Sequence, residues 1–128
     1  MNKLVINVAS EKIFLMIITK DDIYNITKEN SKINYEKLIL IINDFLNSNS
    51  LKLEDINTIY VNRGPGSFAG IRNSLSVVKA INVARKIDYY CYSLEDFKDQ
   101  KHIKYEDIPN LCDKFKIKKN LIKPIYLS

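Results

Sequence analysis

A single glycine-rich stretch, residues 63–72, constrains this chain more than any other feature of its sequence. All three glycines of the 128 residues lie in it, together with one of the three prolines. The stretch follows an apolar run at residues 56–61 and precedes a helix-like run at residues 71–85. Because glycine has no Cβ, it accepts positive φ angles and lets another backbone approach closely. The stretch therefore predicts a strand-to-helix turn of one particular shape.

The length and composition predict one modest domain. Hydrophobic residues make up 46% of the chain, which is enough to fill a core. No apolar run reaches the ~18 residues of a membrane span, and the apolar run at residues 4–6 is too short for a signal peptide. We therefore expect a cytoplasmic protein that does not contact a membrane. Cys91 and Cys112 do not form a disulfide framework in that context.

Positive charge gathers in the tail. Residues 98–128 hold 8 basic and 4 acidic residues, out of 20 and 15 in the chain, so residues 1–97 hold 12 and 11. Two interpretations of the Lys-rich tail stay open. It reflects compositional drift in a chain rich in Ile and Lys, or it contacts RNA by neutralising phosphates.

Hydrophobic periodicity predicts five strands and two long helices. The expected strands cover residues 4–8, 13–19, 23–27, 58–61 and 87–92, and the expected helices cover residues 35–46 and 70–86. The first three strands follow one another closely, so they predict an antiparallel meander. The last two strands are reached through helices, and the right-handed crossover rule makes them parallel to the first. This order predicts an α/β fold, a single ribonuclease-H-like or actin-like ATPase lobe with a mixed five-stranded sheet.

Smaller elements are expected at the ends of these segments. Ser31 or Asn34 is suited to cap the first helix. A short helix is expected over residues 111–117, and residues 124–127 are expected to form a terminal strand or a docking segment.

The familiar catalytic and cofactor motifs are missing from the sequence. No Gly-Lys-Ser/Thr follows the glycines, and their spacing G-x-G-x-x-x-G differs from the dinucleotide fingerprint. The one histidine, His102, lies in the polar tail and is expected to be solvated. We therefore expect no catalytic residue, no metal and no resident cofactor.

The glycine loop leaves two interpretations. It is a tight turn that seats the following helix, or it contacts an anion through Gly66, Ser67 and Gly70 at the N-terminus of that helix. Arg63 and Arg72 flank the loop.

Both long helices carry more apolar surface than one sheet covers. Leu40 and Ile41 fall outside the main stripe of the first helix. Val77, Ala80 and Ala84 form a second stripe on the second helix, and its small residues let another helix approach. This surplus predicts a protein partner, with coverage by the C-terminal segment as the alternative.

The glycine stretch resembles the signature of a known protein family. Residues 59–72 read IYVNRGPGSFAGIR, which is similar to the RGPGSFTGIR signature of the TsaB (YeaZ) family, with Ala69 in place of threonine. The resemblance extends to Ser93-Leu94-Glu95 and covers about residues 3–97, and residues 124–128 resemble the end of full-length members. The signature residues are Arg63, Gly64, Pro65, Gly66, Ser67, Phe68, Gly70 and Arg72.

The resemblance implies a non-catalytic subunit. TsaB proteins are actin-like pseudo-enzymes that pair with the catalytic subunit TsaD through helices equivalent to residues 35–46 and 70–86. With the ATPase TsaE they support threonylcarbamoyl transfer to the tRNA adenosine beside the anticodon (t6A synthesis). Membership implies TsaD as partner, contact with TsaE, a homodimer when alone, weak or indirect tRNA contact and a nucleotide at the partner interface. The expected partner contacts are Leu40, Ile41, Val77, Ala80 and Ala84.

The sequence also departs from the family. Asn7 replaces the usual Asp of the first strand, Asn34 replaces a common His, and residues 98–123 stand where a second lobe is expected. We therefore expect an actin-like lobe over residues 1–97 and a reduced Lys-rich segment over residues 98–128. The alternatives are an ATPase or remnant peptidase, and a self-associating module that binds nucleotide or RNA.

Overall fold

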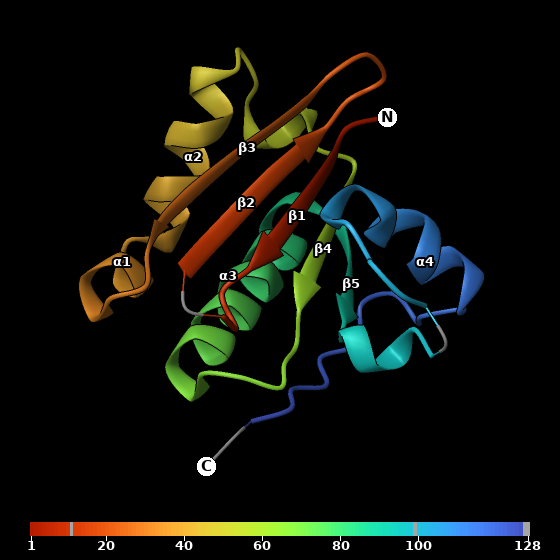
Figure 1. Ribbon diagram of the computed structural model, residues 1–128. Coiled ribbons are helices and arrows are strands. Elements are labelled where there is room, and N and C mark those ends of the chain that lie inside the picture. The colour runs from red at the N-terminus through yellow and green to blue at the C-terminus, as the bar shows by residue number, and fades with distance from the viewer. Residues whose placement is uncertain (11, 99, 127–128) are drawn as a thin grey trace.

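The computed structural model describes residues 1–10, 12–98 and 100–126 and shows one sheet with strand order β3-β2-β1-β4-β5 (Figure 1). β1 pairs antiparallel with β2, which pairs antiparallel with β3, whereas β4 is parallel to both β1 and β5. The predicted mixed five-stranded sheet is thus confirmed. The strands are β1 (Lys3–Asn7), β2 (Lys12–Ile18), β3 (Ile23–Glu29), β4 (Thr58–Asn62) and β5 (Asp88–Tyr92).

The burial of each strand follows its place in the sheet. β1 and β4 are central, and each has four consecutive buried residues because both faces of the sheet are covered. β3 is an edge strand with no fully buried residue, and its partly buried positions alternate with exposed ones. Alternation along β1 therefore divides the core into two layers, with Leu4 and Ile6 facing one side and Val5 the other.

Three helices cover the first face of the sheet: α1 (Lys32–Glu36), α2 (Leu38–Ser48) and α3 (Phe68–Arg85). The buried side chains of α2 and α3 join those of β1 and β4 in one core cluster, and the partly buried Tyr35 of α1 packs against it. Ser31 caps α1, as its Oγ accepts a hydrogen bond from the Asn34 amide at 3.2 Å. The prediction of one helix over residues 35–46 was wrong, because the backbone departs from helical geometry at Lys37 and divides it in two.

The tail covers the second face of the sheet. α4 (Ile108–Lys114) starts three residues before the predicted helix and packs with Phe97 onto Val5, Met16 and Tyr60. Figure 1 shows α4 on the right, beyond β5, while α3 lies behind the sheet. The remaining elements are the short 3₁₀ turns η1 (Leu53–Asp55), η2 (Leu94–Asp96) and η3 (Tyr105–Asp107).

The last described residues run beside the glycine stretch. Tyr126 forms a single parallel bridge with Gly66, and its ring packs against Phe68 with centroids 4.7 Å apart. The expected terminal strand is therefore only a bridge in this region, and residues 127 and 128 lie outside the described part. Within the described residues, no helix combines the length and apolar character needed to span a bilayer.

Candidate functional site

The glycine stretch joins β4 to α3 by passing very close to the end of β1. A Cβ on Gly66 would lie 2.2 Å from the carbonyl oxygen of Ala9, and a Cβ on Gly70 would lie 2.1 Å from that of Val8. Both distances are far inside van der Waals contact, so only glycine fits at either position. The glycines therefore seat the N-terminus of α3 against the chain that leaves β1.

The amides of this turn are largely used within the chain. The Ser67 amide donates to the Ala9 carbonyl at 3.2 Å, and the Gly70 amide donates to the Ser67 Oγ at 3.3 Å. Ser67 is thus the N-cap of α3, which begins two residues before the predicted start. The tight-turn interpretation accounts for Gly66, Ser67 and Gly70 without a ligand, and anion contact at these residues stays a prediction.

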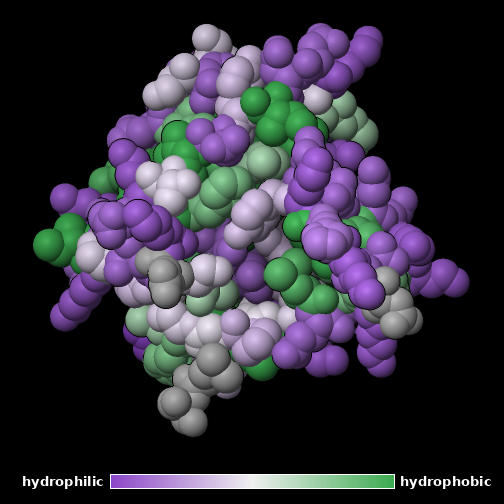
Figure 2. All heavy atoms as spheres, in the orientation of Figure 1, coloured by the Kyte–Doolittle hydropathy of each residue, from purple (hydrophilic) through white to green (hydrophobic). Residues whose placement is uncertain are grey.

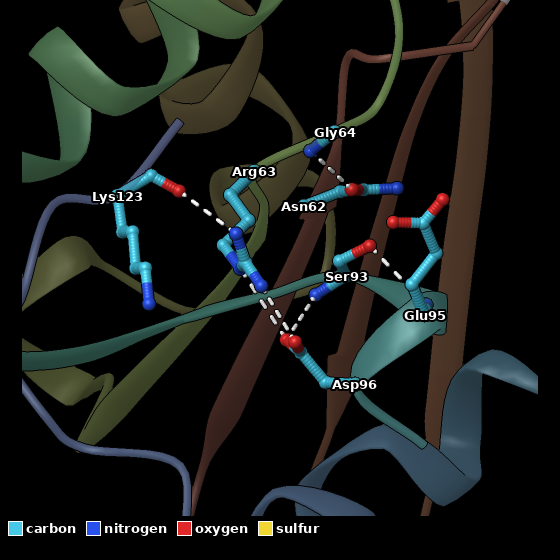
Figure 3. A network of polar contacts seen from close by, with 7 residues as sticks. All are labelled: Asn62, Arg63, Gly64, Ser93, Glu95, Asp96 and Lys123. Atoms are coloured by element: carbon cyan, nitrogen blue, oxygen red, sulfur yellow. Dashed lines mark hydrogen bonds and ion pairs between the residues drawn. The ribbon is translucent and has the colours of Figure 1, made fainter. Parts of the chain in front are cut away.

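Arg63 is held in a nearly buried polar network (Figure 3). Its guanidinium contacts both carboxylate oxygens of Asp96, at 2.5 and 3.3 Å, and the two side chains are only 11% and 20% exposed. A third bond runs from Nη1 to the Lys123 carbonyl at 3.1 Å. Asp96 also accepts a hydrogen bond from the Ser93 amide at 2.8 Å. Arg63 therefore ties the end of β4 to the turn after β5 and to the tail, and its charge is matched by Asp96.

Asn7 is the centre of a second buried network, at the end of β1. Its Oδ1 accepts hydrogen bonds from the Ala9 amide at 3.0 Å and from Asn62 Nδ2 at 3.3 Å. Its Nδ2 donates to Ser10 Oγ at 3.1 Å and to the Tyr105 hydroxyl at 2.6 Å. All the hydrogen-bonding capacity of this side chain is therefore used inside the protein.

Tyr105 brings the tail into this network. Its ring stacks on Phe14 of β2 with centroids 4.0 Å apart, while its hydroxyl reaches Asn7. The tail thus occupies the carboxyl end of β1, the edge at which ligands of α/β sheets bind. Sequence reasoning missed Tyr105, because nothing local pairs two residues 98 positions apart. It also missed Asn62, although a polar residue at the end of an apolar strand was a usable signal.

The titratable groups of the described region do not gather into a metal centre. Within residues 1–10, 12–98 and 100–126, no three His, Cys, Asp or Glu side chains are grouped to hold a metal ion. His102 is exposed. Both cysteines are buried, and burial raises the pKa of the Cys91 thiol to about 11 and that of Cys112 to about 12. Both thiols are therefore protonated and unreactive at neutral pH.

A groove of about 600 Å³ runs between α2 and α3 and brings three predicted contact residues together. Val77, Ala80 and Ala84 line it from α3, and Ile39 lines it from α2. Ala80 and Ala84 are exposed, and Val77 is half-buried. Ile39, which also packs against the core, was not among the predicted contacts.

The other two predicted contacts lie elsewhere on α2. Leu40 is on the outer side of the helix and 57% exposed. Ile41 is half-buried and faces a different groove, between β3 and α2, beside Tyr24 and Ile26. Leu40 is therefore available to a partner that spans both helices, whereas Ile41 is separated from the α2–α3 groove by the helix itself.

A second apolar groove, also of about 600 Å³, lies on the other side of α3. The tail residues Ile122 and Tyr126 form its outer wall, and Val83, 63% exposed, lies on its α3 side. Ala80 borders both grooves. The tail therefore borders the surplus apolar surface of α3 without covering it, and the small residues of α3 form a low ridge between two grooves.

Known proteins resemble the chain over more than half of its length. It is 32% identical over 75 residues, 59% of its length, to the "tRNA threonylcarbamoyladenosine biosynthesis protein TsaB" of Buchnera aphidicola from Baizongia pistaciae. It is 26% identical over 87 residues, 68% of its length, to the protein of the same name from Buchnera aphidicola of Schizaphis graminum. Residues 27–93, just over half of the chain, match the family model described as "TsaD: tRNA N6-adenosine threonylcarbamoyltransferase". The chain belongs to this family, in its TsaB (YeaZ) group.

Solved structures agree with this placement at the level of the fold. YeaZ from Pseudomonas aeruginosa aligns with a TM-score of 0.66 at 20% identity, over 72% of this chain and 43% of that one. An uncharacterised protein described as similar to peptidase YEAZ from Pseudomonas aeruginosa aligns with a TM-score of 0.67 at 18% identity, over 77% and 49%. The chain spans only 34% and 41% of the lengths of the two Buchnera relatives.

Proposed function

We propose that this protein is a non-catalytic subunit of a TsaD-type threonylcarbamoyltransferase, acting in t6A synthesis on tRNA. It pairs with the catalytic subunit through the outer faces of α2 and α3. The observation that carries this proposal is the pair of apolar grooves on either side of the Ala80 ridge. The names of the curated relatives supply the pathway.

The ridge and its grooves have the shape that helix packing requires. Two helices pack with axes 8–10 Å apart, and the spacing is shortest where the residues at the crossing are small. Ala80 and Ala84 provide such a crossing, while Ile39 and Val83 flank it with apolar side chains. A partner helix in each groove would remove this surface from water, at about 25 cal/mol for each Å² of apolar area.

The end of β1 supports a role without catalysis. A hard cation prefers carboxylate ligands, and Asn7 offers a neutral amide whose hydrogen bonds are already made. Tyr105 fills the adjoining space from the tail. We therefore assign Tyr105 and α4 a structural role, as part of the layer that closes the second face of the lobe.

An arginine in the ridge tests the interface. Ala80→Arg would place a long charged side chain between the two grooves, and we expect co-purification with the TsaD-type subunit of the same organism to be lost. Because Ala80 is exposed, the free energy of unfolding should change by no more than about 0.5 kcal/mol. Asn110→Arg is the matched control, since Asn110 is exposed on α4 on the opposite face.

Two results would count against this assignment. Unchanged co-purification of the Ala80→Arg variant would remove α3 from the interface. Equal loss in both arginine variants would show a general effect of charge instead of a contact at the ridge.

A further inference from the structure

The part of the tail from residue 114 to residue 123 concentrates positive charge on one edge of the molecule. These ten residues include five lysines and no acidic residue, and all five lysines are exposed. Figure 2 shows hydrophilic side chains over the edge where α4 and the tail lie in Figure 1. The five are Lys114, Lys116, Lys118, Lys119 and Lys123.

This segment is clamped to the sheet. Ile117 packs onto the second core layer, and Lys119 forms an antiparallel bridge with Tyr90 at the edge of β5. The backbone amide of Asn120 donates a hydrogen bond to the Tyr89 carbonyl at 2.7 Å, and the side-chain Oδ1 of Asn120 accepts one from the Tyr89 backbone amide at 2.9 Å. The backbone that carries the lysines is therefore held in place, so little backbone entropy is lost when a ligand binds.

Three of the lysines converge on one hollow. Lys116, Lys118 and Lys123 line a depression of about 190 Å³ together with Arg63 and Asp96. Asp96 forms a salt bridge with Arg63, as Figure 3 shows, and therefore does not neutralise the charges of the lysines. Within the described residues, these three lysines have no acidic side chain within salt-bridge distance, whereas Lys119 has Asp88 at 3.5 Å.

Positive charges gathered at one place raise the local electrostatic potential and attract an anion. We propose that Lys116, Lys118 and Lys123 bind the phosphate backbone of a structured RNA, and specifically tRNA. The choice of RNA rests on the proposed function, because the named relatives act in tRNA modification. The hollow shares no lining residue with the α2–α3 groove, so RNA and the protein partner would occupy separate surfaces.

The test is a salt titration of the full chain with bulk tRNA carrying a fluorescent label, between 50 and 300 mM KCl. Each phosphate contact contributes about 0.7–0.9 to the slope of log affinity against log salt concentration. The triple variant K116Q/K118Q/K123Q should therefore reduce the magnitude of that negative slope by about 2–3. It should also weaken tRNA binding at 0.1 M salt by about two orders of magnitude. The control K20Q/K28Q/K32Q removes the same charge from exposed lysines elsewhere and should change the slope by less than one contact.

Three outcomes would overturn the proposal: no tRNA binding, equal loss in both triple variants, or tighter binding to phosphatidylserine vesicles than to tRNA. The second would indicate diffuse charge alone, and the third would identify a membrane surface as the polyanion. The Ala80→Arg variant separates this proposal from the proposed function. It should lose the protein partner and keep tRNA binding, whereas the tail triple variant should keep the partner and lose tRNA.

Discussion

Replacement of Asn7 tests whether the polar network at the end of β1 stabilises the fold. Asn7→Leu keeps the approximate volume of the side chain but removes both its acceptor and its donor. The Ala9 amide and the Asn62 Nδ2 then lose their partner at a site where Asn7 itself is only 3% exposed. A buried donor without a partner costs about 1–3 kcal/mol, so these two donors predict a loss of about 2–6 kcal/mol.

Two further variants apportion this loss. Asn7→Asp keeps an oxygen acceptor for the Ala9 amide, and the Tyr105 hydroxyl can turn to donate, so it should lose less stability than Asn7→Leu. Tyr105→Phe removes one hydrogen bond and keeps the ring stacked on Phe14, so it should lose about 0.5–1.5 kcal/mol.

Urea unfolding followed by circular dichroism measures these differences. With a slope of about 2 kcal/mol/M, the middle of the range for a small protein, the Asn7→Leu variant should shift the midpoint down by about 1–3 M. An Asn7→Leu variant as stable as the wild type would refute the reasoning, because it would mean that the network contributes nothing to the folded state. A Tyr105→Phe loss larger than that of Asn7→Leu would place the stabilising contact elsewhere in the tail.

Two other predictions concern the cap of α3 and the thiols. Ser67→Ala removes the acceptor for the Gly70 amide and should lower the free energy of unfolding by about 0.5–2 kcal/mol in urea, and an unchanged midpoint would contradict the cap. Burial raises the pKa of Cys91 to about 11 and that of Cys112 to about 12, so neither should react with Ellman's reagent at pH 8 until urea unfolds the chain. Because these pKa values lie above the ordinary thiol value of 9.0, stability should be intact below pH 9 and fall as pH rises toward 12, measured as the urea midpoint against pH.

The sheet was predictable because its signals are local. Alternation along residues 23–27 and the apolar runs at residues 4–6 and 59–61 reflect how many faces of each strand are covered, and this follows from the residues themselves. The short connections of the meander and the crossover rule then order the strands. The helix over residues 70–86 was also predicted well, apart from the two residues that Ser67 adds at its start.

The candidate interface was predictable only in part. Helical periodicity places Val77, Ala80 and Ala84 on one stripe, and the structure confirms that they share a groove. Periodicity gives a direction around a helix axis but does not say what lies in that direction. Leu40 and Ile41 both leave the main stripe, yet Leu40 faces solvent whereas Ile41 packs beside β3.

The sequence by itself determined the strand order, the glycine turn and the family, because each of these follows from local patterns and short connections along the chain. Only the tertiary structure decided what the tail does. It closes the second face of the sheet, carries Tyr105 to Asn7 across 98 positions, and brings Lys123 beside Arg63 across 60. Such contacts join segments with no shared local pattern, and they form only when the sheet has brought the ends of β1, β4 and β5 to one edge.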